Sequence, residues 1–383
     1  METTKQTTEL THLDMGTEPY EELETESLSQ WELMWRQFRR HRLAMAGSVV
    51  LILFYLVALS AGFVATQDPV QRNAKYAYTP PQLPKFIDAE GKFHMRPFVY
   101  GLTQETDPDT WEKVYVVDHT VQHPLKLFVR GTPYKWFGLF QSNVHLFGVE
   151  GNAPFFLLGT DALGRDMFSR IIHGAQISLS IGLIGVFISL ILGLAIGGLS
   201  GLLGGTVDIV IQRLIEFLIS IPHIPFWMAL SAALPASWSA IKTYFAITVL
   251  LSLLSWTEVA RVVRGKFLSL RETDFVAASI SMGGSNWWVI FKHLIPNFLS
   301  YVLVTVSLTI PGMILGETSL SFLGIGLRPP AISWGVLLQQ AQNMRTVALR
   351  PWLLLPGLFV VIAVLAFNFV GDGLRDAADP YAD

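Results

Sequence analysis

The chain has 383 residues, of which 51% are hydrophobic and only 15% are charged, and its net charge at pH 7 is −3. An average soluble domain is about a quarter charged, so this composition indicates a membrane protein, and the net charge argues against a nucleic-acid partner. The chain has no cysteine, which excludes disulfides and thiolate metal sites but does not identify a compartment.

The first part of the chain reads as a tail followed by a surface helix. Residues 1–30 are acidic and rich in Ser and Thr, which predicts a disordered cytoplasmic tail. In residues 31–42, Trp31, Trp35 and Phe38 recur at helical spacing opposite a group of arginines. This pattern predicts an amphipathic interfacial helix that leads into the first membrane span.

Six runs without charged residues locate the candidate membrane spans. A span needs roughly 20 apolar residues, and only the fourth run is clearly shorter. It becomes long enough if its helix extends past Lys242 or Glu258. Pro222 and Pro225 predict a kink or break in the third span. The runs are residues 43–67, 174–207, 217–241, 243–257, 294–316 and 351–371.

Arginines and lysines beside the spans predict the orientation. The larger groups surround the start of span one, the segment 261–271 and the C-terminus, and a minority lies at the opposite ends of the spans. We therefore expect an all-α polytopic membrane protein with about six transmembrane helices and both termini in the cytoplasm.

Residues 68–158 form an insertion between spans one and two. Short runs at 114–117 and 125–129 have the composition of β-strands. We expect a small, β-containing extracytoplasmic domain rather than an unstructured loop. His119 and His123 lie four apart in strand-like sequence, which does not favour a metal site.

Span two carries a row of glycines with a spacing of four residues. Such a row allows the backbone of another helix to approach closely. Packing within this chain is favoured over an interface between subunits. The row consists of Gly193, Gly197, Gly201 and Gly205.

A polar, helix-forming segment separates spans four and five. Acidic residues lie at the start of the predicted helix, where the helix dipole favours them, and two glycines are expected to end the helix. Phe275, Ala278, Ser279 and Met282 are expected to share a small apolar face that another protein could grip. The alternative is a solvated amphipathic loop, and the pattern alone does not decide between them. The candidate contact residues are Arg271, Glu272, Asp274, Phe275, Ala277, Ala278, Ser279, Gly283, Gly284 and Pro296.

The chain carries no recognisable nucleotide site of its own. Gly91-Lys92 and Gly265-Lys266 are both followed by Phe, where a phosphate-binding loop requires Ser or Thr. Neither a His-Glu-x-x-His motif nor a catalytic pair of carboxylates is present in the sequence. We therefore expect a protein that is not an enzyme by itself and binds no cofactor.

Ala277-Ala278-Ser279 precede Gly283 by six residues, and Pro296 follows that glycine by thirteen. This spacing resembles the "EAA" coupling loop of ABC-importer permeases, except that Ala277 stands where that loop usually has Glu. Four ordered segments resemble the second permease subunit of dipeptide, oligopeptide and nickel ABC importers. These segments are residues 158–170, 274–297, 317–335 and 371–380.

The resemblance implies a permease core over residues 159–383, with a coupling loop at 263–286. It implies a heterodimer with a homologous permease subunit, two cytoplasmic ABC ATPase subunits that bind ATP and Mg, and an extracytoplasmic peptide-binding protein. It further implies alternating access in a bacterial or archaeal cytoplasmic membrane. Because Ala277 is not acidic, Glu272 or Asp274 is expected to take that role. The insertion is longer than the usual external loop of the family.

Glu216, His223 and Glu317 are candidates for lining the translocation path, because ionisable groups in spans usually face protein or water. The alternatives are an interfacial position for Glu216, hydrogen bonds to freed carbonyls for His223 and interfacial hydrogen bonding for Glu317. Alternative functions are import of nickel or another small solute, a membrane scaffold, and an ATP-independent secondary transporter. The last predicts charges within several spans and inverted repeats, and the sequence shows neither.

Overall fold

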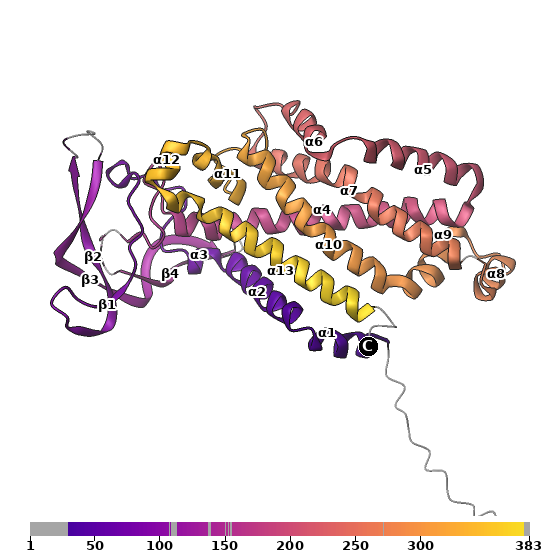
Figure 1. Ribbon diagram of the computed structural model, residues 1–383, viewed down its shortest axis with the longest axis horizontal. Helices are drawn as coiled ribbons and strands as arrows, with labels where there is room; N and C mark the ends of the chain where they lie inside the picture. Colours follow the sequence, from indigo (N-terminus) through magenta and orange to yellow (C-terminus); the bar gives the residue numbers. More distant parts are fainter. Residues whose placement is uncertain are drawn as a thin grey trace, which may run out of the picture.

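The computed structural model describes residues 30–106, 108, 113–136, 139–149, 151, 153, 155–270 and 272–378. The predicted tail therefore lies outside the described residues, except for residue 30. Long helices form an elongated bundle, a β-sheet lies at one end of it, and the short helix α8 lies at the other (Figure 1).

The N-terminal helices are α1 (Gln30–Arg40), α2 (Arg42–Leu59) and the single turn α3 (Ala61–Val64). His41 separates the first two and caps α2, with its Nδ1 accepting from the Ala44 N–H at 3.0 Å. The predicted amphipathic helix is thus present as a helix. Its Met34 and Phe38 pack against Ala377 of the C-terminal helix, whereas Trp35 is exposed.

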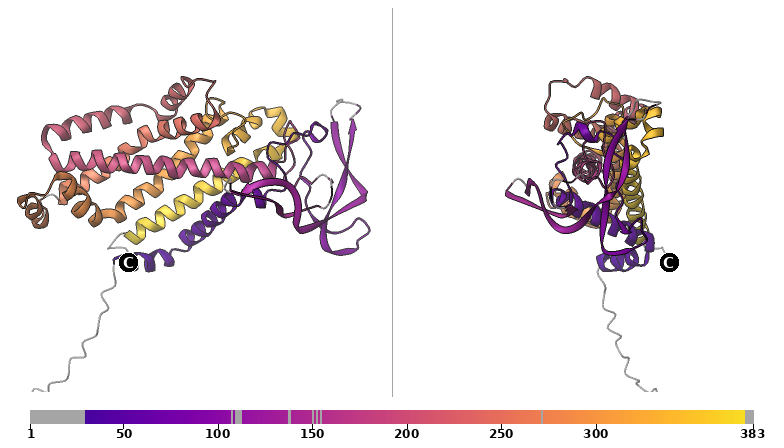
Figure 2. Two further views of the ribbon diagram at one scale, coloured as in Figure 1. Left: turned by 180° about the vertical axis from the view of Figure 1, so that it is seen from behind. Right: turned by 90° about the vertical axis from the view of Figure 1, so that its left-hand side faces the viewer.

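Five helical segments are long and apolar enough to span a membrane, and a bent pair can supply a sixth. The segments are Arg42–Leu59 (α2), Met167–Leu203 (α4), Ala240–Leu270 (α7), Val302–Phe322 within α10 (Ile295–Phe322), and Pro351–Ala378, which contains α13 (Leu355–Ala378). End-on, α4 lies between α5 and α6 on one side and α2 and α13 on the other (Figure 2).

The third predicted span, 217–241, is broken, and its helical parts lie earlier in the chain than predicted. It is divided between α5 (Gly205–Ser220) and α6 (His223–Ala232), which meet at an angle of 85°. Pro222 sits at the break and has no N–H to continue the helix, so the predicted break is confirmed. The fourth span is α7, whose 31 residues extend past both Lys242 and Glu258.

The glycine row of α4 packs against α7. A Cβ on Gly193 would lie 2.5 Å from the Val259 Cβ, and one on Gly197 would lie 2.4 Å from the Ala260 carbonyl oxygen. A Cβ on Gly201 would lie 2.5 Å from the Phe267 Cβ. Packing within the chain is therefore confirmed for these three glycines. Gly205 begins α5 and has open space around it.

The insertion contains the 3₁₀ turn η1 (Ala74–Tyr76) and a four-stranded antiparallel sheet in the order β1-β2-β3-β4. The strands are β1 (Lys85–Ile87), β2 (Phe93–Thr106), β3 (Lys113–Trp136) and β4 (Phe140–Val149). The segments predicted as strands, 114–117 and 125–129, are both in strand conformation, but they belong to one long strand, β3, and not to two short ones.

Pro124 explains why one strand has the sequence pattern of two. Pairing with β2 ends at Pro124, and pairing with β4 begins at Leu125. Proline has no N–H to donate to a neighbouring strand. Pro124 lies where β3 changes partners, so the lack of this donor interrupts neither pairing. His119 of β3 packs its ring on Tyr100. Among the described residues, no group of three or more His, Cys, Asp or Glu side chains could hold a metal.

The remaining short elements form the connections from α7 to α10 and from α10 to α13. After α7 come α8 (Asp274–Ser281), α9 (Asn286–Trp288) and a π-helical turn, η2 (Val289–Leu294). After α10 come α11 (Trp334–Leu338), η3 (Gln339–Gln342), α12 (Met344–Leu349) and η4 (Pro351–Leu354). The largest buried cluster joins side chains of α2, α4, α7, α10 and α13, so the spans share one core.

Candidate functional site

The segment between α7 and α10 contains the short helix that the sequence predicted. Residues 263–270 of the range 263–286 belong to α7, so the connection begins after Leu270. Thr273 is the N-cap of α8, and Asp274 lies in its first turn, where the helix dipole favours a carboxylate. Gly283 ends the helix with a φ of +85°, a conformation that suits glycine.

The two faces of α8 differ from the prediction. Val276 and Ser279 are buried, and Val276 packs with Val289 and Ile290 of the following turn. Phe275, Ala278 and Met282 are exposed as predicted, but Ser279 does not share their face. An eight-residue helix has room for one buried stripe, and the branched apolar side chain of Val276 occupies it together with Ser279 one turn later. The spacing between these two residues was the signal that sequence reasoning missed.

The two glycines after α8 have different roles. Gly283 has open space where a Cβ would lie, so only its backbone conformation requires glycine. Gly284 donates its N–H to the Ser279 carbonyl oxygen, and a Cβ there would lie 2.8 Å from the same oxygen. One glycine thus sets the turn, and the other allows a close approach.

The other predicted loop residues lie around this turn. Glu272, Asp274 and Ala277 are exposed. Arg271 lies outside the described residues. Pro296 is the second residue of α10, where a proline costs the helix no internal hydrogen bond.

The path from α8 into the membrane is not a regular helix. The π-helical turn Val289–Leu294 leads into α10, and Phe298 has non-helical backbone angles of −130° and 19°. Such π-helical turns are rare and occur often at functional sites. Because Val276 packs on this turn, a displacement of α8 has a direct contact through which it can reach α10.

The three candidate path residues have different surroundings. Glu216 is exposed on α5 and pairs with Arg213 at 2.7 Å. His223 begins α6, its ring centroid lies 5.6 Å from that of Trp227 at a tilt, and it lines a groove of about 490 Å³ between α6 and α10. Glu317 does not line this groove.

Glu317 is instead buried within a set of serine hydroxyls. Ser321 and Ser333 donate to its Oε1 at 2.8 and 2.6 Å, and Ser178 donates to its Oε2 at 3.3 Å. Ser178 also accepts the backbone N–H of Trp334. The carboxylate therefore ties α10 to α4 and to the start of α11, which is the hydrogen-bonding alternative to a path lining.

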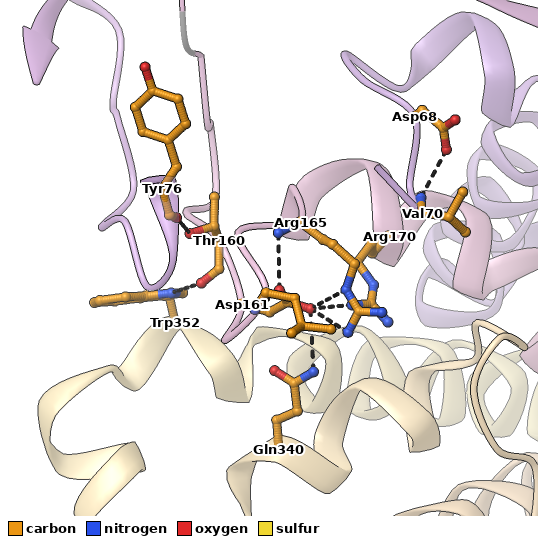
Figure 3. Close-up of polar contacts among 10 residues, drawn as sticks. Asp68, Val70, Tyr76, Thr160, Asp161, Arg165, Arg170, Gln340 and Trp352 are labelled. Atoms are coloured by element: carbon orange, nitrogen blue, oxygen red, sulfur yellow. Dashed lines mark hydrogen bonds and ion pairs between the residues drawn. The ribbon is translucent and has the colours of Figure 1, made fainter. Parts of the chain in front are cut away.

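A buried ionic cluster before α4 was not foreseen from the sequence (Figure 3). The Asp161 carboxylate is fully buried and accepts from Arg165 Nε at 2.7 Å, from Arg170 and from Gln340 Nε2 at 3.3 Å. The backbone N–H groups of Leu163 and Arg165 donate to its other oxygen. The sequence placed the two arginines beside a span and within the family-like segment 158–170, but it gave no indication that they pair with Asp161.

Two opposing effects act on the pKa of Asp161. Burial raises it, but the charges of Arg170 and Arg165 and the backbone N–H groups lower it further, so the net pKa lies below its usual value. Nearby, the indole N–H of Trp352 donates to the Thr160 carbonyl oxygen at 3.0 Å, and the Thr160 hydroxyl donates to Tyr76 (Figure 3). These contacts thus join the segments before α4 and α13 to η1, near the start of the insertion.

A second buried carboxylate, Asp166, caps α4. Its Oδ2 accepts from the Ser169 N–H at 2.8 Å and from the Thr66 hydroxyl at 3.1 Å, while its Oδ1 is buried without a hydrogen-bond partner. Burial raises the pKa of Asp166 to about 6, which outweighs these hydrogen bonds. Among the described residues, no cation forms an ion pair with Asp166 as Arg165 and Arg170 do with Asp161.

We expect Asp166→Asn to change how stability depends on pH. The carboxyl loses its proton near pH 4 in the unfolded chain and near pH 6 in the folded chain. The free energy of unfolding therefore falls as pH rises from 4 to 6, by about 3 kcal/mol in total. Asparagine keeps the cap without the charge. Thermal unfolding in detergent should show the variant gaining stability over the wild type between pH 4 and 6. Parallel curves would contradict this, and Asp118→Asn, whose pKa is lowered by its hydrogen bonds to Thr120, should show no such gain.

At the opposite end of α4, an ion pair connects α5 to α7. Arg264 donates from two nitrogens to both oxygens of Asp208, each at 2.5 Å, and Ser200 of α4 donates to the same carboxylate. This bidentate geometry fixes the turn between α4 and α5 against the end of α7.

Comparison with known proteins identifies the family of this arrangement. Residues 185–382 match the family described as binding-protein-dependent transport system inner membrane component. Residues 29–81 match the N-terminal transmembrane domain of oligopeptide transport permease C. The chain belongs to this family of importer permeases. Several membrane-spanning helices are thus expected of it, and the structure supplies five or six.

The relatives are named as peptide permeases. The chain is 43% identical over 223 residues to the oligopeptide transport system permease protein OppC of Haemophilus influenzae, covering 58% of this chain and 69% of that one. It is 30% identical to OppC of Bacillus subtilis, covering 94% and 92% of the two chains. It is also 30% identical to the dipeptide permease DppC of Lactococcus lactis, covering 96% and 95%. An inward-facing MetNI methionine ABC transporter structure gives a TM-score of 0.43 at 19% identity over 55% of this chain and 97% of that one.

Proposed function

We propose that this chain is a transmembrane permease subunit of an ABC importer for dipeptides or oligopeptides. The observation that carries the proposal is the placement of α8. It projects from the bundle end opposite the sheet, with exposed Phe275, Ala278 and Met282 (Figure 1). A membrane-protein helix with such a face is suited to a contact outside the bilayer. Peptides are the proposed cargo because the relatives named above are oligopeptide and dipeptide permeases.

The proposed assembly places α8 and both termini in the cytoplasm and the sheet on the other side of the membrane. Its partners are a homologous second permease subunit, two ABC ATPase subunits that carry ATP and Mg, and an extracytoplasmic peptide-binding protein. The proposed location is a bacterial or archaeal cytoplasmic membrane. This chain carries no catalytic role in the proposal, and the ATPase subunits hydrolyse ATP.

The proposed mechanism is alternating access driven through α8. Closure of the ATPases displaces α8, and Val276 passes the displacement to the π-helical turn and then to α10. Movement of α10 relative to α6 changes the groove lined by His223, so this groove is the proposed part of the path on this chain. Since Ala277 is not acidic, the contact rests on shape together with Glu272 and Asp274.

We expect Gly283→Trp to reduce peptide uptake by about tenfold or more, while leaving the assembled complex able to bind ATP. The turn has a φ of +85°, which side chains rarely adopt, and an indole there would obstruct the exposed face of α8. Uptake of a labelled peptide into proteoliposomes and nucleotide binding by the same preparation measure the two effects.

The matched control is Gly91→Trp. Gly91 has a φ of +84° and equally open surroundings, but lies in the turn between β1 and β2. Its substitution carries the same backbone penalty far from α8 and should leave uptake within about twofold of the wild type, as for other surface changes. Wild-type uptake by Gly283→Trp would refute the coupling role of α8.

A further inference from the structure

The β3–β4 hairpin is fixed to the end of the first span. The Nδ1 atom of buried His145 lies 2.5 Å from the carbonyl oxygen of Ala65, directly after α3. Gly62 of α3 lies so close to Tyr134 that a Cβ would be 2.4 Å from its ring. The β4 side of the sheet therefore lies beside α3, whereas the β1–β2 side extends away from the helices (Figure 1). The hairpin is thus held at the level where span one leaves the membrane.

This hairpin exposes large apolar side chains. Phe128, Leu139 and Phe140 are 64%, 78% and 71% exposed, and Trp136 pairs across the strands with Phe140. The Phe63 ring of α3 lies 6.3 Å from that of Phe128 and 6.2 Å from that of Trp136. The apolar surface of the hairpin is therefore continuous with α3.

The same surface continues along the first span. Ile52, Leu56 and Leu59 of α2 are each more than half exposed and follow one another at spacings of three and four residues. Phe63 is the next position in this row. An exposed apolar row on a membrane-spanning helix faces lipid tails. The surface that meets the hairpin is thus a lipid-facing one.

The charges of the hairpin also distinguish it from the rest of the sheet. Residues 126–149 contain Lys126, Arg130 and Lys135 and no Asp or Glu. The β1–β2 side, by contrast, carries Asp88 and Glu105 among its acidic residues. Aromatic and cationic side chains together are typical of the membrane interface, where the rings sit at headgroup level and the cations meet lipid phosphates.

We propose that the β3–β4 hairpin is a membrane anchor that inserts Phe128, Trp136, Leu139 and Phe140 into the lipid headgroup region at the end of span one. Arg130 and Lys135 contact anionic headgroups beside them. The anchor holds the sheet at a fixed height over the bilayer. This inference rests on the position of span one and is independent of the cargo and of the ATPase contact.

The absence of native cysteine allows a direct test with the full chain. Leu139→Cys and, as the matched control, Met95→Cys are labelled with the fluorophore NBD in the complete importer. Met95 is 92% exposed on β2, so both sites are apolar and accessible. The complexes are placed in nanodiscs of phosphatidylcholine, with and without phosphatidylglycerol, that contain lipids nitroxide-labelled near the top of the acyl chain.

We expect the nitroxide lipids to quench NBD at position 139 at least about twofold more than at position 95, as an interfacial segment requires. Lys135→Gln with Arg130→Gln should reduce this quenching only in the anionic nanodiscs. Equal and low quenching at both positions would overturn the anchor. A second result would also overturn it: full quenching of NBD at position 139 by iodide in the water, which disappears when the peptide-binding protein is added. The hairpin would then contact that protein and not the lipid. Unchanged quenching in the double variant would reject the role of the cations.

Discussion

Asp161→Asn is expected to destabilise the folded chain by about 3–5 kcal/mol, because it removes a carboxylate that is paired with two buried guanidinium groups. Arg170 is 1% exposed and Arg165 8% exposed, so neither charge can turn to water when its partner is lost. Asparagine keeps the shape of the side chain and can still accept one of the backbone N–H groups. The loss therefore reports the charge itself. Thermal unfolding in detergent and the yield of monodisperse protein measure it.

Glu216→Gln is the matched control for this change. It also removes a carboxylate from an arginine pair, but the side chains of Glu216 and Arg213 are 61% and 78% exposed. Exposed pairs contribute about 0–1 kcal/mol, so the control should unfold close to the wild type. Equal stabilities of the two variants would show that the buried cluster contributes no more to the free energy of unfolding than an exposed ion pair does.

The same cluster sets a second expectation for acid pH. Because the pKa of Asp161 is lower in the folded chain than its usual value, its stabilising contribution is present above that usual value. It is lost as pH falls through the lower, folded-state pKa. This is opposite in sign to Asp166, whose raised pKa costs stability as pH rises between about 4 and 6. The two neighbouring carboxyls can therefore be separated by the pH range in which each variant differs from the wild type.

Sequence patterns located the spans well where charge and proline are the deciding features. The break at Pro222 follows from a missing N–H, which is a local property. The length of α7 could be stated only as a condition, because its charge-free run is short and becomes a span only if the helix extends past Lys242 or Glu258, as it does. Charged side chains near a helix end can reach the interface, so they bound a span less sharply than a charge-free run suggests.

The candidate site was predictable to the extent that it is local. The start of α8 at Asp274 and its end at Gly283 depend on the dipole and on a positive φ, and both could be read from the residues. The spacing of Val276 and Ser279 shows that they share a face, but which face is buried could not be read, since it depends on the packing of Val276 against the turn 289–294. The contacts of Asp161 with Gln340 and of Glu317 with Ser178 join residues far apart in the chain, and no local pattern contains them.

Gly197→Leu is expected to separate α4 from α7 and to destabilise the bundle by about 3 kcal/mol or more, at the upper end of overpacking effects. A Cβ at this position would lie 2.4 Å from the carbonyl oxygen of Ala260 and 2.8 Å from its Cα. Both atoms belong to the backbone of a 31-residue helix, so no side chain can turn aside to make room. The variant must shift a whole helix, which we expect to appear as a lower unfolding temperature and poor assembly.

Gly265→Leu is the control for the same substitution in the same pair of helices. Gly265 lies on α7 with open space where its Cβ would be, and leucine favours a helix over glycine by roughly 0.5–1 kcal/mol. It should therefore unfold at or slightly above the wild-type temperature. If the two leucine variants unfold alike, the close contact at Gly197 does not hold α4 and α7 together. If only Gly197→Leu lowers the unfolding temperature and impairs assembly, the glycine row is a structural contact within the chain, and its surface is not available to a second subunit.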